Sequence, residues 1–184
     1  MARVRDVAYG GYLFRSKVEA QWALVLDRLG VEYVYEPDTY QLHLTGTAKT
    51  TSYIPDFEVP QWNAFVEIKY APEPDLDACR KCAALAKVTG KDVYLFFRPP
   101  WDQVVSKGRK VPVSGYRYAA GTGAFEPSYQ LTECPHCKAV DVAPFGRLAA
   151  LRCPCPQAHP ALRHHDAKRI VDAVRVSQRE RFAT

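Results

Sequence analysis

Large apolar residues in the first part of the chain follow the period of an α-helix. Across Lys17–Leu29 they recur every three or four residues, with Ser16 in front as an N-cap and Gly30 behind as a stop. We therefore predict a helix over this stretch. Residues 31–35 then read as a short strand.

Two more strands are predicted in the next segment. Residues 52–59 and 64–69 are separated by the sequence Pro-Gln-Trp-Asn, which is short enough to join them as an antiparallel hairpin. Before them, the polar stretch over residues 45–51 is predicted to be a hairpin loop.

A second helix and a further strand follow. The helix is predicted over residues 75–89 and is closed by Gly90. Residues 93–97 are apolar without interruption, which is typical of a strand covered on both faces, and two prolines at 99 and 100 end it. The order of helix, three strands, helix and strand indicates an α/β fold.

The pattern loosens beyond residue 100. Residues 101–118 hold four Lys or Arg and one Asp, and predict a basic loop or irregular strands. Residues 163–182 hold six Lys or Arg and three Asp or Glu, which suits phosphate contact but is also common on solvated helices. A terminal helix is predicted over residues 166–182. Its inward side chains are expected to be Ile170, Val171, Val174 and Phe182.

The composition is that of an ordinary globular chain, with 47% hydrophobic and 24% charged residues among 184. We expect a main domain over residues 1–118 and a small module over residues 119–184. No apolar run approaches the roughly 20 residues that span a bilayer, and the N-terminus lacks a secretory pattern, so we expect a cytoplasmic location and no membrane partner. The net charge of +5 permits attraction to polyanions but is weak evidence alone.

Acidic residues on the two hairpin strands are the first candidates for chemistry. Alternate residues of a strand share a face, so Asp56 and Glu58 are expected on one side of their strand, and Glu67 and Lys69 on one side of the next. If Asp56 and Glu67 converge, their carboxylates and the carbonyl of Ile68 suit Mg²⁺ or Mn²⁺. Lys69 would then orient the attacking water or neutralise charge on a phosphate. The structural alternative is a set of charges at the edge of a sheet.

Glu19 is a candidate for an additional metal ligand. It lies at the edge of the apolar face of the first helix, three residues before Trp22, where a solvated carboxylate is less common. The alternative is an ordinary flanking residue paired with Arg15.

Three motifs together resemble the PD-(D/E)XK, or restriction-endonuclease-like, nuclease superfamily. They are Phe-Arg-Ser-Lys-Val-Glu-Ala-Gln-Trp-Ala at residues 14–23, Tyr-Ile-Pro-Asp-Phe at 53–57 and Val-Glu-Ile-Lys at 66–69. The resemblance covers about residues 11–98 and is similar to the small phage and bacterial branch. It implies an α-β-β-β-α-β core with a mixed sheet flanked by helices. The active-site residues that it implies are Glu19, Asp56, Glu67 and Lys69.

The resemblance implies a metal-dependent enzyme that hydrolyses DNA phosphodiester bonds with Mg²⁺ or Mn²⁺. Such an enzyme would process phage or mobile-element DNA in a bacterial host cytoplasm. DNA is the expected partner, and a second copy of the chain or another replication or recombination protein is a further one. The alternative is a non-catalytic module that binds nucleic acid or protein. Cleavage mode and substrate form stay open, because this fold hosts all of them.

Four cysteines near the C-terminus have the spacing of a structural zinc site of the zinc-ribbon type. They are Cys134, Cys137, Cys153 and Cys155. The second pair is Cys-x-Cys rather than Cys-x-x-Cys, so His159 or His136 is an alternative to Cys155 as the fourth ligand. The module could hold DNA, contact a partner or stabilise the C-terminal region.

The two remaining cysteines, Cys79 and Cys82, fall on the second predicted helix among apolar residues. In that context cysteine behaves as a small hydrophobic core residue, and we predict packing rather than metal binding. Without a secretory pattern, a framework of disulfides is not expected.

Overall fold

The computed structural model describes residues 6–46, 48, 50–70, 75–97, 100, 105–106, 109–110, 114–144, 152–153, 155 and 168–182. The chain forms two compact units, each assembled from separate segments. The terminal unit comprises Met1–Val31, Arg98–Val113 and Gln130–Thr184, and the central unit comprises Glu32–Phe97 and Ser114–Tyr129. These are units of packing, and the predicted domain boundary after residue 118 stays a prediction.

The described residues form three α-helices and thirteen strands. The helices are α1 (Lys17–Leu29), α2 (Leu76–Thr89) and α3 (Lys168–Arg179). The strands up to the second helix are β1 (Val7–Tyr9), β2 (Tyr12–Phe14), β3 (Val34–Tyr35), β4 (Tyr40–His43), β5 (Thr50–Tyr53), β6 (Phe57–Val59) and β7 (Ala64–Lys69). Those after it are β8 (Asp92–Phe97), β9 (Val105–Ser106), β10 (Arg109–Lys110), β11 (Ser114–Tyr118), β12 (Phe125–Glu133) and β13 (Val140–Pro144).

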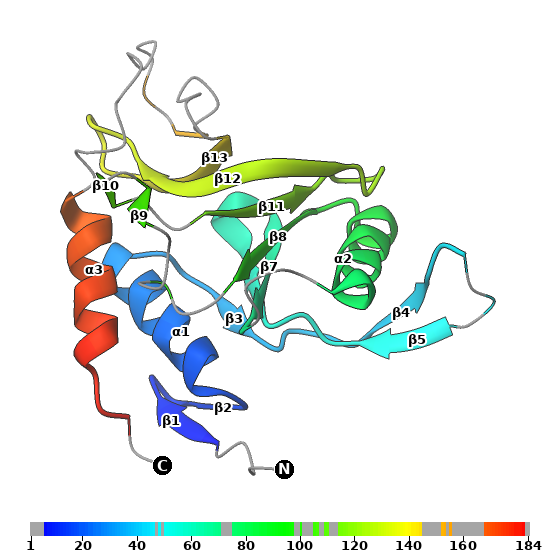
Figure 1. Cartoon of the computed structure of the whole chain (residues 1–184), viewed down its shortest axis with the longest axis horizontal. Coiled ribbons are helices and arrows are strands. Elements are labelled where there is room, and N and C mark those ends of the chain that lie inside the picture. The colour runs from blue at the N-terminus through cyan, green and yellow to red at the C-terminus, as the bar shows by residue number, and fades with distance from the viewer. Residues whose placement is uncertain are drawn as a thin grey trace. The chain divides into compact units, whose positions relative to one another are not determined.

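A mixed seven-stranded sheet, in the order β13-β12-β11-β8-β7-β6-β3, confirms the predicted α/β class (Figure 1). Three pairs of strands stand apart from it as two-stranded sheets: β1 with β2, β4 with β5, and β9 with β10. The sequence pattern missed the β1–β2 hairpin and the strands β12 and β13. Of the predicted basic stretch 101–118, β11 joins the large sheet and β9 and β10 pair with each other, while the rest lies outside the described residues.

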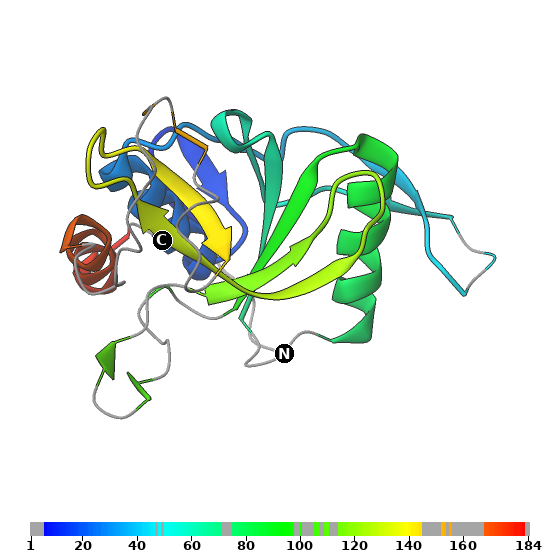
Figure 2. The ribbon, with the colours of Figure 1, turned by 90° about the horizontal axis from the view of Figure 1, so that it is seen from above.

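Helix α1 has the predicted ends because its signals are local. The side chain of Ser16 accepts a hydrogen bond from the backbone N–H of Glu19, and Gly30 adopts the left-handed conformation with φ of 68°. Within the terminal unit, α1 and α3 lie side by side (Figures 1 and 2).

Helix α3 is shorter than predicted and its buried face is shifted. It ends at Arg179 instead of 182, and residues 166 and 167 lie outside the described part. Its buried side chains are Ile170, Ala173 and Ser177. Ile170 was expected to be buried, but Val171 and Val174 are only half-buried. Phe182 is half-buried beyond the end of the helix, with its ring 5.7 Å from that of Tyr9.

The single strand predicted over residues 52–59 is wrong. The chain forms β5 and then β6, which belong to different sheets, with a bend at residues 54–56 between them. Pro55 has no N–H to donate to a strand ladder, which favours the break. Asp56 therefore lies in the bend, and the expectation that it shares a strand face with Glu58 does not hold.

The antiparallel hairpin of β6 and β7 is confirmed, with Phe57 opposite Val66 and Val59 opposite Ala64. Its connection is a short 3-10 helix over Pro60–Trp62. The predicted hairpin loop is confirmed as the connection between β4 and β5, although β5 begins at Thr50, inside the predicted range. Strand β8 runs parallel to β7, and its residues up to Phe96 are buried, as expected for a strand covered on both faces.

Helix α2 covers one face of the central unit's strands (Figure 2). Its cap residue Asp75 accepts from the backbone N–H of Ala78 at 2.6 Å, and Gly90 ends it as predicted. Cys82 is fully buried against this face and Cys79 packs beside it, which confirms the predicted packing role of both thiols. None of the helices in the described part of the chain is long and apolar enough to span a membrane.

Two glycines between β11 and β12 offer a test of the contact with α2. Both have a positive φ, 70° at Gly121 and 65° at Gly123. A Cβ at Gly121 would meet nothing within 4 Å, whereas one at Gly123 would lie 2.4 Å from the carbonyl oxygen of Ala83. Replacing Gly121 by Ala should cost about 1–2 kcal/mol of backbone strain.

Gly123→Ala should lower the free energy of unfolding by about 1–3 kcal/mol more, because overpacking adds to the same strain. Urea denaturation of the two variants measures the difference. Equal losses would show that the turn moves freely against α2.

Candidate functional site

Asp56 is tied to strand β7 through its side chain. The carboxylate oxygen Oδ2 accepts a hydrogen bond from the backbone N–H of Ile68 at 2.7 Å, and the residue is 8% exposed. The backbone carbonyl of Asp56 accepts from the N–H of Glu36 at 2.9 Å. Both contacts hold the bend against its neighbouring strands, so a carboxylate is kept beside the C-terminal half of β7.

Glu67 lies on β7 and is almost completely buried, with 2% of its surface exposed. Its oxygen Oε1 accepts a hydrogen bond from the ammonium group of Lys69, which confirms that both residues face the same side of the strand. Its other oxygen, Oε2, is buried with no hydrogen-bond partner among the residues that the structure describes. A buried polar atom left in this state costs about 1–3 kcal/mol. The free oxygen is therefore suited to a cation or a donor from outside the chain.

Lys69 stays charged beside these carboxylates. Burial lowers the pKa of its ammonium group, but the negative charge of Glu67 and the hydrogen bond to it raise the pKa by more, and the net direction is upward. The side chain is 37% exposed. A protonated lysine at the edge of a buried carboxylate pair can thus reach a bound anion.

Two groups that the sequence reasoning missed border this cluster. Burial, followed by the charge of Glu67, raises the pKa of Tyr53 well above its usual value. The same two causes, in the same order, raise the pKa of the Cys82 thiol. Tyr53 could have been noticed, because it begins the 53–57 motif that contains Asp56. Cys82 was assigned to packing, which is its observed environment.

Glu19 belongs to the terminal unit, whereas Asp56, Glu67 and Lys69 come together in the central unit. The hydroxyl of Ser16 donates to Oε1 of Glu19 at 2.6 Å and accepts from its backbone N–H at 3.2 Å. This exchange is a form of the capping box, which stabilises the start of α1. Sequence reasoning overlooked the Ser-x-x-Glu pattern, and the metal-binding role of Glu19 stays a prediction.

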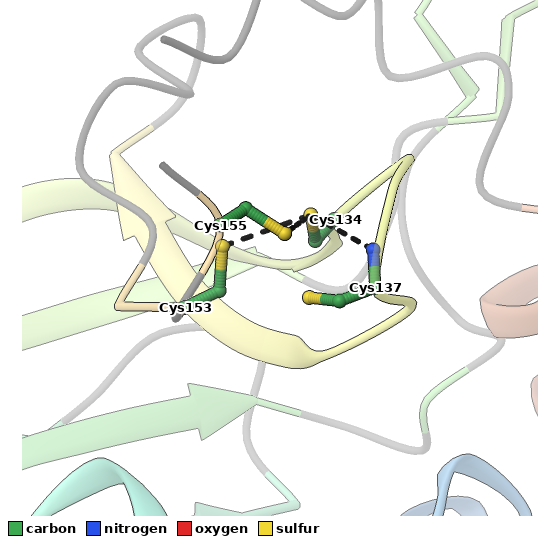
Figure 3. A group of neighbouring side chains, drawn as sticks. All are labelled: Cys134, Cys137, Cys153 and Cys155. Atoms are coloured by element: carbon green, nitrogen blue, oxygen red, sulfur yellow. Dashed lines mark hydrogen bonds between the residues drawn. The ribbon is translucent and has the colours of Figure 1, made fainter. Parts of the chain in front are cut away.

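The four C-terminal cysteines come together in the terminal unit, with all four sulfurs within 4.8 Å of one another. Their side chains point toward one another (Figure 3). Sγ of Cys134 lies 3.7 Å from that of Cys153 and 3.8 Å from that of Cys155. A tetrahedron with Zn–S bonds of about 2.3 Å has edges of about 3.8 Å, whereas a disulfide requires about 2.05 Å. The group could therefore hold a metal such as zinc.

Local backbone geometry builds both halves of the group. The turn between β12 and β13 is closed by hydrogen bonds from the N–H of Cys134 to the carbonyl of Ala139 at 2.8 Å and from that of Lys138 to the carbonyl of Cys134 at 3.0 Å. The second pair is anchored by Arg152, whose backbone N–H donates to buried Asp141 at 2.8 Å and whose guanidinium pairs with it at 3.1 Å.

The thiols have unequal affinities for protons. Burial raises the pKa of Cys134, but hydrogen bonds from the backbone at Cys137 and His136 lower it by more, to about 7. Hydrogen bonding to Cys137, followed by burial, raises the pKa of Cys155 to about 12. Thiols this close cannot all ionise without a cation among them. His136 is exposed and stands outside the four-cysteine group, while His159 lies outside the described residues.

Formal charge is divided unevenly between the two units. The terminal unit contains 18 Lys or Arg and 9 Asp or Glu, a net charge of +9, and the central unit contains 7 and 11, a net charge of −4. The candidate carboxylates are thus part of an acidic unit, and the cysteines are part of a strongly basic one.

Comparison of the chain with protein-family models, with curated proteins and with solved structures found no match.

The cysteine geometry predicts about one zinc ion per chain. Cys134→Ser should release it and increase amide exchange in the turn between β12 and β13, because the ion would cross-link this turn to the second cysteine pair. Cys79→Ser is the matched control and should leave the zinc content unchanged. That thiol lies on α2 and packs against the hydrophobic cluster of the central unit. Elemental analysis and hydrogen exchange provide the measurements.

Cys155→Ser tests the fourth ligand. Zinc retained by this variant would shift the assignment to His136 or His159. Zinc-free wild-type protein with an ordered turn would contradict the metal centre, and zinc lost on changing Cys79 would mean that the cysteines had been paired wrongly.

Proposed function

We propose that this protein is a metal-dependent nuclease that hydrolyses DNA phosphodiester bonds, built on a restriction-endonuclease-like core. The observation that carries the proposal is the buried carboxylate of Glu67, which has one oxygen on a protonated lysine and the other without a partner in the described residues. The side chain of Asp56 accepts a hydrogen bond from the backbone N–H of Ile68, the residue after Glu67 on β7. Two carboxylates beside a cationic side chain suit phosphodiester chemistry.

Each residue of this cluster is assigned a separate role. Asp56 and Glu67 would hold Mg²⁺ or Mn²⁺, with the carbonyl of Ile68 as a further oxygen ligand. When bound, such a cation neutralises phosphate charge and lowers the pKa of the attacking water. Lys69 holds its ammonium group at the exposed side of the pair, where it orients that water or a phosphate oxygen.

Two further features support the proposal. The helix α1, the β6–β7 hairpin, helix α2 and the parallel strand β8 follow the order implied by the resemblance. The terminal unit, with a net charge of +9, suits a polyanionic substrate. We assign the cysteine group a structural zinc ion, because thiolates favour zinc and carboxylates favour Mg²⁺ or Mn²⁺.

Metal-stripped protein should regain cleavage of DNA only when Mg²⁺ or Mn²⁺ is added, tested on labelled linear, circular, single-stranded and branched forms. Asp56→Asn, Glu67→Gln and Lys69→Met should each reduce the rate by about 100-fold or more, because each removes charge at the reacting phosphate. Glu58→Gln is the matched control, since Glu58 lies on β6 of the same sheet and also pairs with a lysine, Lys91, but is partly exposed. It should keep the wild-type rate.

Folded wild-type protein that leaves every DNA form intact with either metal would rule out the enzyme. Retained DNA binding in that case would favour a non-catalytic binding module instead.

Glu19→Gln separates a metal ligand from a helix cap. The amide still accepts the hydrogen bond from Ser16, so the melting temperature should stay within about 2 °C of wild type, which corresponds to a loss below about 1 kcal/mol. Cleavage should nevertheless fall by at least 10-fold, because the ligand charge is lost.

Ser16→Ala is the complementary variant. It should lower stability by about 1 kcal/mol with little change in the cleavage rate per folded molecule. Full activity in Glu19→Gln would restrict this carboxylate to capping α1.

A further inference from the structure

Tyr53 is the last residue of β5 and stands three residues before Asp56. Its phenolic oxygen is buried and has no hydrogen-bond partner within the described part of the chain. A tyrosine hydroxyl in the interior normally finds such a partner. The ring packs against the hydrophobic cluster under α2, so packing explains the burial of the ring but not that of the hydroxyl.

The hydroxyl of Tyr53 and the oxygen Oε2 of Glu67 are chemically complementary. A phenol can donate one hydrogen bond, and Oε2 of Glu67 can accept one while keeping a second lone pair. The side chains are held in one region, because Tyr53 leads into the bend whose Asp56 binds the backbone of Ile68, the neighbour of Glu67. The ring of Tyr53 packs against the cluster that contains Phe65, which lies two residues before Glu67 on β7 and so shares its strand face. A phenol carries its proton at neutral pH, so its hydroxyl can act as the donor.

Carboxylates that hold a metal ion are themselves oriented by hydrogen bonds from neighbouring groups. Glu67 receives one such bond at Oε1, from Lys69. At Oε2 the available donor is Tyr53, which leaves the second lone pair of that oxygen for a cation.

We infer that Tyr53 is a positioning residue of the candidate site: when a divalent cation binds, its hydroxyl donates a hydrogen bond to Oε2 and orients the carboxylate of Glu67. This inference rests on the proposed function for the identity of the site. It adds a fourth side chain of the central unit to Asp56, Glu67 and Lys69. It also explains why a polar atom is buried where phenylalanine would pack equally well.

Tyr53→Phe removes this one oxygen and keeps the ring. Affinity for Mn²⁺, measured by calorimetry on metal-stripped protein without DNA, should fall by about 10- to 100-fold. The melting temperature of the stripped protein should not fall and is expected to rise by about 2–4 °C, because an unsatisfied buried group is removed. The control is Tyr40→Phe, which removes a hydroxyl from the residue directly opposite on β4. It should change neither quantity.

Unchanged Mn²⁺ affinity in Tyr53→Phe, with wild-type protein binding Mn²⁺ and cutting DNA, would overturn the inference and leave the proposed function intact. A lower melting temperature with unchanged affinity would likewise overturn it, since the phenol would then be structural. Wild-type protein that binds Mn²⁺ but cuts no DNA would reject the nuclease, and a weaker affinity in Tyr53→Phe would still support the positioning role. Wild-type protein that binds no Mn²⁺ would overturn both.

Discussion

One hydrogen bond, from the backbone N–H of Ile68 to the carboxylate of Asp56, fixes the layout of the candidate active site. Pro55 interrupts the strand ladder, so the segment that leaves β5 bends before it resumes as β6. The side chain of Asp56 replaces the missing backbone contact and attaches the bend to β7. Because Glu67 and Lys69 flank Ile68, the same bond brings a second carboxylate beside them. The attachment of the bend and the position of its carboxylate both depend on an acceptor side chain at position 56, because an apolar side chain there could not accept this bond.

The terminal unit depends on a comparable bridge made by Arg169 of α3. Its guanidinium donates to the carbonyl of Leu29 at the end of α1, to the carbonyl of Lys138 at 3.0 Å and to Glu133 at 3.3 Å. The first contact satisfies a carbonyl that a helix end leaves unpaired. The other two reach the turn that carries the first cysteine pair. The cysteine turn, which could hold a metal, and the docking of α3 on α1 therefore share one side chain, and the loss of either should loosen the other.

The sequence predicted those features whose causes are local. Helices α1 and α2 end where expected, because caps such as Ser16 and Gly30 act within one turn. The break at Pro55 was missed because the apolar pattern continued through it, although proline has no N–H for the ladder. Asp56, Glu67 and Lys69 could be chosen as candidates from the spacing of residues along strands and from the motifs that contain them. The hydroxyl of Tyr53, which lacks a hydrogen-bond partner among the described residues, could not be predicted, because burial depends on segments distant in sequence. The cap that Glu19 forms with Ser16 was missed, although the Ser-x-x-Glu pattern is local.

Two Glu–Lys pairs at the sheet differ in how deeply the glutamate is buried. Glu58 and Lys91 are 20% and 31% exposed, and the ammonium group of Lys91 lies 5.2 Å from the ring centre of Phe65. Such a pair keeps much of its hydration and adds a cation–π contact, so it stabilises the sheet modestly. Glu67 gives up nearly all of its hydration and recovers one hydrogen bond at one oxygen. A single ion pair often fails to offset the desolvation of a buried carboxylate, and replacing a buried pair by apolar residues is often neutral or stabilising. Burial of Glu67 in this state therefore favours the proposed role of its carboxylate in holding a cation.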